Sequence, residues 1–452
     1  MQSINPTTGQ IIKEYPEHSL AECYDILLKV DKAWESWKST AFSERARLIK
    51  QVARELLAQR DQYARLITQE MGKIIKTARA EVEKCALICD YYADHAAAML
   101  ADEAIPLETG RCFVTFEPIG AVLGIMPWNF PFWQVCRFAV PLLMAGNAGV
   151  LKHASNVCGC ALALEDIFRR AGFPENLFRT VLIPGNQVEP LIAHPLIKGV
   201  ALTGSEAAGS QVAATAGRYL KKTVMELGGS DPFIVLEDAD FDLCSTLAVK
   251  ARMQNAGQTC IAAKRFIVVE KVAAAFEARH QEIIENLVVG DPLEPGTNLG
   301  PLARNDLRQQ LHQQVHDSIR LGARLVTGGK SLEGPGFYYA PTILADVKKG
   351  MPVYDQETFG PVSAIITVQD EAEALAVAND SPYGLGASIW TQDLARGERL
   401  ARRIESGTVV VNTLTKSDPR LPFGGVKKSG YGRELSHYGL KEFVNIKTIY
   451  IA

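Results

Sequence analysis

Residues 121–131 read AVLGIMPWNFP, a short apolar run that ends at a proline and is followed by a helix-like segment up to Ala145. Three further apolar runs, each followed by a helix-like segment, recur at intervals of about 25–30 residues. They are GVLK (149–152), RTVLI (179–183) and VALT (200–203). Repeated strand-then-helix units predict a parallel sheet with crossover helices, as in nucleotide-binding α/β domains.

A second series of strand-like runs begins after Glu226: FIVLED, RFIVVE, ARLVTGG, VSAIITV and SGTVVVN. Helix-like stretches separate them, so we expect a second α/β domain. Residues 20–100 have helical periodicity. The paired glycines at 228–229 suit a hinge between the two domains. We therefore predict a first domain over 1–99 and 119–228 and a second over 229–428.

The stretches 100–118 and 429–452 fit neither series. FVTFEP and VNIKTIYIA have the alternation of exposed strands, which need a partner. They pair with each other in one subunit or across an interface between subunits. We predict that the two stretches form a small β oligomerisation element in a homodimer or homotetramer.

The bulk composition is that of an ordinary globular protein: 47% of the 452 residues are hydrophobic, 22% are charged, and the net charge is −3. Without a basic cluster, neither nucleic acid nor a membrane surface is an expected partner. The first residues lack a signal-peptide pattern, and the longest apolar stretches are too short to cross a bilayer, so we expect a cytoplasmic location. The nine cysteines have neither a disulfide-framework nor a metal-ligand pattern, so no metal is expected.

Polar and small residues follow each of the four first strands. They are Pro127-Trp128-Asn129, Lys152-His153-Ala154-Ser155, Pro184-Gly185-Asn186 and Thr203-Gly204-Ser205. The carboxyl ends of parallel strands form the ligand-binding edge of a sheet, and the helix after Ser205 offers free N–H groups to a phosphate. The sequence therefore predicts a nucleotide groove here, although the GxGxxG fingerprint is absent.

Six motifs in a fixed order resemble the aldehyde dehydrogenase superfamily over nearly the whole chain. They are PWNFP (127–131), LTGS (202–205), MELGGSDP (225–232), GQTC (257–260), ETFGPV (357–362) and PFGGVKKSG (422–430). The resemblance implies an α/β fold with a Rossmann-like cofactor domain, an α/β catalytic domain and the small β element. The sequence is most similar to the short bacterial succinate-semialdehyde dehydrogenases.

The resemblance also implies catalytic roles for three residues. Cys260 attacks the aldehyde to form a thiohemiacetal, and the Asn129 amide with the backbone N–H of Cys260 stabilises the oxyanion. Glu226 is the general base for the water that hydrolyses the thioester. This base argues against the CoA-acylating branch of the family. Each of two residues has another interpretation when it is taken alone. Cys260 is then an ordinary buried cysteine, and Glu226 is a helix-capping residue or a surface charge.

The cofactor residues implied by the resemblance are Trp128, Lys152, Ser155, Gly204, Ser205, Leu227, Glu357 and Phe359. Strictly NAD-dependent relatives often have a glutamate where this chain has Ser155. A carboxylate would repel a 2′-phosphate, whereas Ser155 beside Lys152 accepts one. We therefore expect use of both NAD and NADP, with NADP preferred.

Arg137 is the main indication of the substrate, because succinate-semialdehyde dehydrogenases have an arginine at this place and arginine binds a carboxylate through two hydrogen bonds. The alternative is a salt bridge on a helix face. A second arginine of some relatives is Gln254 here, so Ser417 and Arg420 are the candidates for the missing contact. Glu434 matches a proposed proton relay, but a surface carboxylate is the favoured interpretation.

The resemblance thus predicts oxidation of succinate semialdehyde, an aldehyde with a distal carboxylate, to succinate. One alternative is another aldehyde such as glutarate semialdehyde, since a methylene gives only about 1–3 kcal/mol of discrimination. A second alternative belongs to a different functional class: a structural protein that binds the cofactor but catalyses no reaction.

Overall fold

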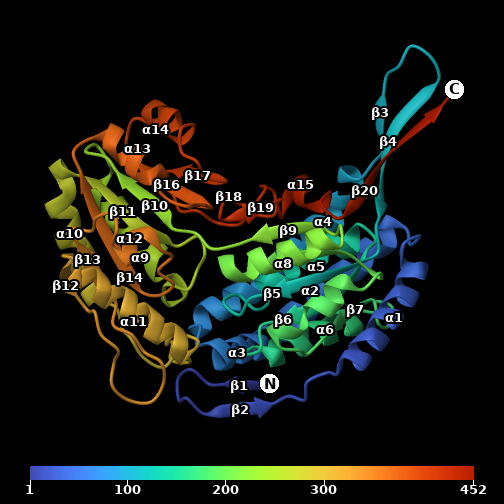
Figure 1. The fold of residues 1–452 in the computed structure, drawn as a ribbon, viewed down its shortest axis with the longest axis horizontal. Coiled ribbons are helices and arrows are strands. Elements are labelled where there is room, and N and C mark those ends of the chain that lie inside the picture. Colours follow the sequence, from blue (N-terminus) through green and yellow to red (C-terminus); the bar gives the residue numbers. More distant parts are fainter.

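Two sheets, each covered by helices, form the two halves of the computed structural model, which describes residues 1–452 (Figure 1). The first sheet has six strands in the order β19-β9-β8-β5-β6-β7. Its strands are β5 (Ala121–Met126), β6 (Ala148–His153), β7 (Phe178–Thr180), β8 (Ile197–Thr203), β9 (Lys222–Glu226) and β19 (Gly430–Tyr431). All pair in parallel except β19, which is antiparallel to β9. The predicted parallel sheet is therefore confirmed.

Two details of this sheet differ from the sequence-based expectation. The predicted strand 179–183 continues only to Thr180, because Pro184 follows shortly and cannot extend a strand ladder. The strand β9 was not expected, since its KTVME sequence carries few apolar residues. It pairs beside β8 and places Glu226 opposite Thr203 at the carboxyl edge of the sheet.

Helices cover both faces of the first sheet, and an N-terminal group of four precedes it. These helices are α1 (Leu20–Trp37), α2 (Phe42–Ala58), α3 (Arg60–Met71), α4 (Ile75–Met99), α5 (Trp133–Met144), α6 (Cys158–Arg170), α7 (Glu189–Ala193) and α8 (Glu206–Arg218). Local signals set several ends. Ser19 and Glu22 form a capping box at the start of α1, and Gly72 ends α3 with a φ of 80°.

The second sheet has seven strands in the order β12-β13-β14-β11-β10-β16-β17. They are β10 (Asp231–Val235), β11 (Ala263–Val269), β12 (Arg324–Thr327), β13 (Thr342–Ala345), β14 (Val362–Val368), β16 (Gly386–Trp390) and β17 (Thr408–Val411). Five match the predicted series, and β12 is the antiparallel edge. The strands β13 and β16 were missed because TILA is short and GASIW begins with small residues.

The helices of the second half pack on both sides of its sheet. They are α9 (Phe241–Met253), α10 (Glu270–Glu285), α11 (Asn305–Arg320), α12 (Pro352–Asp355), α13 (Glu371–Asn379) and α14 (Leu394–Ala401). No helix of the protein combines the length and the apolar character needed to cross a lipid bilayer.

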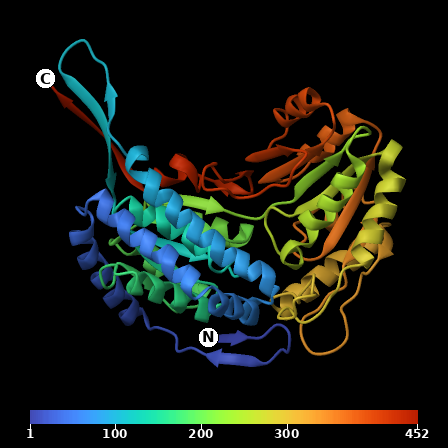
Figure 2. The same ribbon diagram turned by 180° about the vertical axis from the view of Figure 1, so that it is seen from behind.

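A third sheet projects from the first half and is seen clearly from behind (Figure 2). Its strands are β3 (Glu103–Ile105), β4 (Arg111–Pro118) and β20 (Val444–Ile451), in the order β20-β4-β3. The stretches that contain FVTFEP and VNIKTIYIA pair antiparallel with each other in the same chain, which is the first of the two predicted arrangements. At the N-terminus, β1 (Gln2–Ile4) and β2 (Ile11–Glu14) form a separate hairpin.

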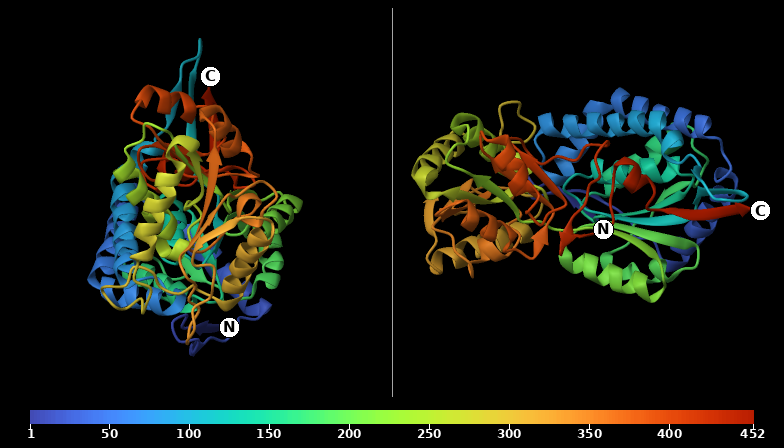
Figure 3. Two further views of the ribbon diagram at one scale, coloured as in Figure 1. Left: turned by 90° about the vertical axis from the view of Figure 1, so that its left-hand side faces the viewer. Right: turned by 90° about the horizontal axis from the view of Figure 1, so that it is seen from above.

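The C-terminal part of the chain connects the two halves, which lie side by side when viewed from above (Figure 3). Strand β18 (Val426–Lys427) pairs with β15 (Tyr383–Gly384), and β19 then joins the first sheet beside β9. A short helix, α15 (Ser436–Leu440), packs against α4 and α5 before β20 begins. The predicted domain limits at residues 228 and 428 stay predictions.

Candidate active site

A cleft of about 470 Å³ opens where the carboxyl edge of the first sheet faces the second half. From the first half it is lined by residues that follow β5, β8 and β9, including Trp128, Asn129, Thr203, Gly204, Ser205 and Leu227. The other wall contains Cys260, side chains of α11, and the segment that carries Glu357 and Phe359. Its volume is in the range of small-molecule sites.

Cys260 reaches this cleft because of the tight turn that precedes it. Asn255 and Ala256 both have positive φ angles, of 55° and 53°, and Gly257 follows with φ 73°. A side chain at position 257 would overlap with the carbonyl group of Gly360, so only glycine fits. Cys260 is half-buried, whereas the other eight cysteines are buried. The turn therefore presents one thiol to the cleft.

The predicted oxyanion donor is attached to the same turn. Asn129 Nδ2 donates a hydrogen bond to the carbonyl oxygen of Gln258 at 3.1 Å. The Asn255 side chain donates in turn to the backbone carbonyl of Asn129 at 2.9 Å. The Asn129 side chain is 4% exposed and lines the cleft. These contacts hold the amide beside the nucleophile loop, and the second hydrogen on Nδ2 stays free for a ligand.

Lys264 lies directly behind the nucleophile and was not identified from the sequence. Its ammonium donates to the carbonyl oxygens of Cys260 at 2.6 Å and Thr259 at 3.1 Å. It also forms an ion pair with Glu357 Oε1 at 3.2 Å, and its side chain is fully buried. Lys264 is the second residue of the buried strand β11, and a lysine in a buried strand almost never lacks a partner, which is the signal that could have identified it.

The electrostatics of the cleft act directly on the thiol. Burial raises the pKa of the Cys260 thiol to about 11. The positive charges of Arg137 and then Lys264 oppose this rise, because both favour the thiolate. The acid groups of Glu226 and Glu357 add to it. The thiol is therefore held mostly protonated at neutral pH, close to two cations that stabilise its ionised form.

Glu226 ends β9 and lies beside the cleft rather than in its wall. Its side chain is 2% exposed, and Oε1 has no hydrogen-bond partner. Burial raises the pKa of Glu226 to about 8, and the negative charge of Glu434 adds to this shift. Gly424 packs so closely that a β-carbon there would lie 2.8 Å from Oε1. The carboxyl group is thus kept in a site where it exchanges a proton near neutral pH.

Six of the eight predicted cofactor residues line the cleft: Trp128, Gly204, Ser205, Leu227, Glu357 and Phe359. Trp128 and Phe359 meet edge to face, with ring centroids 5.7 Å apart. Glu357 Oε1 accepts a hydrogen bond from the backbone N–H of Gly229 at 3.0 Å. This contact and the ion pair with Lys264 both engage Oε1, so Oε2 has no hydrogen-bond partner in the protein and is available to a ligand hydroxyl.

The other two predicted cofactor residues lie at the end of the neighbouring strand β6. Lys152 is buried and forms no ion pair, and burial lowers its pKa. Ser155 is exposed. A buried ammonium without a carboxylate partner favours an anionic ligand. Together with the N-terminus of α8 at Glu206, this donor set fits a phosphorylated dinucleotide.

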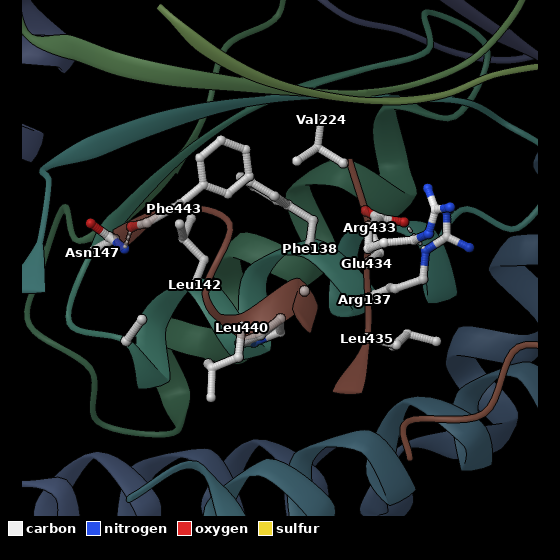
Figure 4. A pocket seen from close by; sticks show the side chains of 13 residues that line it. Arg137, Phe138, Leu142, Asn147, Val224, Arg433, Glu434, Leu435, Leu440 and Phe443 are labelled. Carbon is white, nitrogen blue, oxygen red and sulfur yellow. Dashed lines mark hydrogen bonds and ion pairs between the residues drawn. The ribbon is translucent and has the colours of Figure 1, made fainter. Parts of the chain in front are cut away.

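Arg137 and Glu434 form a buried ion pair, in which the two side chains point toward one another (Figure 4). Arg137 is 2% exposed, donates to Thr203 Oγ1 at 3.3 Å, and lies over the Phe423 ring with its centroid 4.7 Å away. Glu434 is 7% exposed, so the favoured interpretation as a surface carboxylate was wrong. The tertiary structure brings the pair together from residues almost 300 positions apart (434 − 137 = 297). The charge of Arg137 therefore already has a partner in the protein.

The two further substrate candidates behave differently from each other. Arg420 is exposed and forms an ion pair with Asp418 at 2.7 Å. Ser417 is 8% exposed and accepts a hydrogen bond from Lys84 Nζ at 2.7 Å. The structure thus brings Ser417 to α4, while the Arg420 guanidinium is already engaged by a neighbour in its own loop.

Comparisons with known proteins agree with this geometry. The model of the aldehyde dehydrogenase family matches residues 1–449. A probable succinate-semialdehyde dehydrogenase (NADP+) of Synechocystis is 51% identical over 450 residues, which cover 100% of this chain and 99% of that protein. The succinate-semialdehyde dehydrogenase (NADP+) of Mycolicibacterium paratuberculosis is 47% identical, with 99% and 96% covered. The crystal structure of the Streptococcus pyogenes succinic semialdehyde dehydrogenase, in complex with NADP+, is 39% identical with a TM-score of 0.98, covering 100% and 99%.

Proposed function

The chain belongs to the aldehyde dehydrogenase family, and from this premise we propose that it oxidises succinate semialdehyde to succinate with NADP+. The observation that carries the proposal is the position of Cys260. Alone among nine cysteines it is not buried, and it lines a cleft that also contains Asn129 and Glu357. A non-catalytic binding protein would have no use for a thiol at this place.

In the proposed reaction, the thiol of Cys260 first loses its proton to solvent; the thiolate sulfur then bonds to the aldehyde carbon as the carbonyl π bond breaks, and the carbonyl oxygen becomes an oxyanion. Asn129 Nδ2 and the backbone N–H of Cys260 donate to that oxygen. Lys264 donates to the Thr259 carbonyl oxygen at 3.1 Å and so restrains the Thr259–Cys260 peptide, which supplies the second of these donors. A bound NADP+ would supply the hydride acceptor for the thiohemiacetal carbon. A thioester on Cys260 remains.

The second half of the proposed reaction depends on Glu226. Its carboxylate removes a proton from a water molecule as the water oxygen bonds to the thioester carbon. The carbon–sulfur bond then breaks, the acid leaves and the thiolate of Cys260 is restored. A pKa near 8 suits a group that must accept this proton and release it to solvent.

The cofactor would be held along the edge of the first sheet. Lys152 and Ser155 provide a place for a 2′-phosphate without a competing carboxylate. Gly204 and Ser205 at the start of α8 suit the pyrophosphate. Glu357 would accept hydrogen bonds from the nicotinamide ribose. The NADP+ named for two relatives and one solved structure supports this preference.

A panel of aldehydes tests the proposal. Formation of reduced cofactor would be followed with succinate semialdehyde, glutarate semialdehyde and butanal, each with NADP+ and NAD+. We expect the highest kcat/KM with succinate semialdehyde and NADP+, and no turnover in Cys260→Ser. A preference for butanal would refute the substrate assignment, and inactivity with every aldehyde would refute the enzymatic one.

We also infer that the protein is a cytoplasmic homodimer or homotetramer. The third sheet supports assembly, because both of its outer strands, β3 and β20, are free edges. Ile446, Tyr450 and Ile451 on β20 are exposed apolar side chains. Light scattering coupled to gel filtration would measure the number of subunits, and a monomer at micromolar concentration would contradict this inference.

A further inference from the structure

Lys73 and Glu81 form an ion pair that is buried inside the first half of the molecule. Lys73 lies in the turn between α3 and α4, and Glu81 lies near the start of α4. The ammonium contacts Glu81 Oε2, and both side chains are 1% exposed. Burial lowers the pKa of Lys73, and the charge of Glu81 opposes this shift. Removing two charges from water costs about as much as their attraction returns, so stability alone does not explain a pair at this depth.

Both partners of the pair hold the short segment between β5 and α5. Glu81 Oε1 accepts hydrogen bonds from the backbone N–H groups of Phe132 at 2.9 Å and Trp133 at 3.0 Å. The Lys73 ammonium lies 3.6 Å from the centroid of the Phe130 ring. One oxygen of the carboxylate thus holds the backbone of the segment, and the cation on the other oxygen holds its aromatic side chain.

The start of α5 depends on this contact because its own sequence supplies no cap. The N-cap residue is Phe132, whose side chain cannot accept a hydrogen bond. The first N–H groups of a helix need acceptors, and the helix dipole favours a negative charge beside them. Glu81, from a different helix, is the acceptor that the structure provides. The carboxylate therefore fixes where α5 begins and where the segment before it lies.

Asn129 lies at the end of the held segment that faces the cleft, directly before Phe130. Its amide nitrogen donates to the nucleophile loop, and its Oδ1 has no hydrogen-bond partner. The place of the amide therefore depends on the backbone that carries it. Asn255 holds that backbone at the Asn129 carbonyl, and the Lys73–Glu81 pair holds it over the next four residues. A displacement of about 1 Å at a reacting group is enough to slow catalysis about 100-fold.

We propose that Lys73 and Glu81 are positioning residues, which fix the Asn129 amide at the place where the oxyanion forms. This inference rests on the proposed function, but it uses only the aldehyde group of the substrate. Neither member of the pair lines the cleft, so both act through the backbone of residues 130–133. The oxyanion exists only after the sulfur has bonded to the aldehyde carbon. Correct placement of the donor therefore lowers the barrier of this step and leaves the binding of the substrate unchanged.

The test is a double-mutant cycle between Glu81 and Asn129, in which stopped-flow absorbance of the reduced cofactor gives the rate of the first turnover. Glu81→Gln keeps the size of the side chain and weakens both hydrogen bonds, because it removes their charge. We expect the first-turnover rate to fall about 10- to 100-fold, with the KM values for aldehyde and NADP+ unchanged. Asn129→Ala should lower the rate about 10²- to 10³-fold. In the Asn129→Ala background, Glu81→Gln should cause no further fall, and effects that multiply would overturn the proposal.

A charge-neutral variant separates positioning from folding. Glu81→Gln leaves the Lys73 ammonium buried without a partner, which by itself destabilises the fold. The double variant Lys73→Met/Glu81→Gln removes both charges at similar volume. Its melting temperature should stay near that of the wild type while its first-turnover rate falls as in Glu81→Gln, and a wild-type rate would refute the role of the pair. Asp90→Asn and Lys76→Met, which remove exposed charges on the same helix, are the matched controls and should change neither value.

The outcomes also separate this inference from the function on which it rests. Alkylation of Cys260 by iodoacetamide needs no oxyanion donor, so its rate should be that of the wild type in both variants. A matching fall in the alkylation rate would place the effect on the nucleophile and would overturn the proposal. If the wild-type protein oxidises no aldehyde, the proposed function is wrong. If it does, and the variants keep its first-turnover rate, only the role of Lys73 and Glu81 is refuted.

Discussion

Glu226→Gln is expected to separate formation of the thioester from its hydrolysis. The glutamine keeps the size of the side chain, which is 2% exposed, and removes the base. The enzyme should still release reduced cofactor in a burst of about one equivalent per Cys260, since this step does not use Glu226. The steady rate after the burst should fall about 10²- to 10⁴-fold, which is the usual contribution of a general base.

The pH dependence follows from the raised pKa of Glu226. With a pKa of about 8, roughly a tenth of the carboxyl groups are ionised near pH 7 and roughly nine tenths near pH 9. Hydrolysis in the wild type should therefore rise about tenfold over this interval. Burial is the main cause of the raised pKa and Glu434 the second, so Glu434→Gln should move the inflection to lower pH.

Stopped-flow absorbance of the reduced cofactor measures both phases in one trace. Glu285→Gln, an exposed glutamate on α10, is the matched control and should keep the wild-type profile. Loss of the burst together with the steady rate would place Glu226 in the first half of the reaction. A wild-type inflection near pH 4–5 would show instead that the carboxylate is not held in the buried state described above.

Three further perturbations address the nucleophile loop and the cofactor. Lys264→Met removes a cation that lowers the pKa of Cys260. The pH profile of thiol alkylation should therefore move to higher pH, and kcat should fall. An unchanged pH profile would refute the contact between Lys264 and the nucleophile loop. Ser155→Glu should raise the KM for NADP+ at least about tenfold and leave the KM for NAD+ unchanged. The ratio of kcat/KM with NADP+ to kcat/KM with NAD+ measures this effect, and no change in that ratio would exclude binding of the 2′-phosphate at Ser155. Gly257→Ala should lower the melting temperature by several degrees, because φ is 73° and the Gly360 carbonyl occupies the space, whereas Gly296→Ala, in open space, should not.

Much of the fold was predictable because its signals are local. The strands at 121–126 and 362–368 are short apolar runs, and such runs form buried parallel strands whatever lies far away in the chain. The strand at 386–390 was missed since its small residues acquire strand structure only between β10 and β17. The pairing of β4 with β20 was one of two alternatives, and only the folded chain decided between them.

The candidate site, like the fold, was predictable from the sequence only in part. Motif order identified Cys260, Asn129 and Glu226 as candidates, and the cleft contains the first two. The sequence alone favoured a substrate contact for Arg137, with a salt bridge on a helix face as the alternative, and a surface position for Glu434. Nothing local in the sequence relates two residues so far apart, so their pairing was not predicted.

What the sequence determined by itself is the set of reactive groups and the strands that carry them. Tertiary structure decided which charges are paired. Arg137 forms an ion pair with Glu434 and Lys264 forms one with Glu357, whereas Lys84 donates to the neutral hydroxyl of Ser417, 333 positions away. Charge pairing acts through space over a few ångströms, and burial strengthens it, so it depends on how the helices pack and not on their order. Which buried cations have a carboxylate partner, and that Lys152 has none, is therefore decided only in the folded protein.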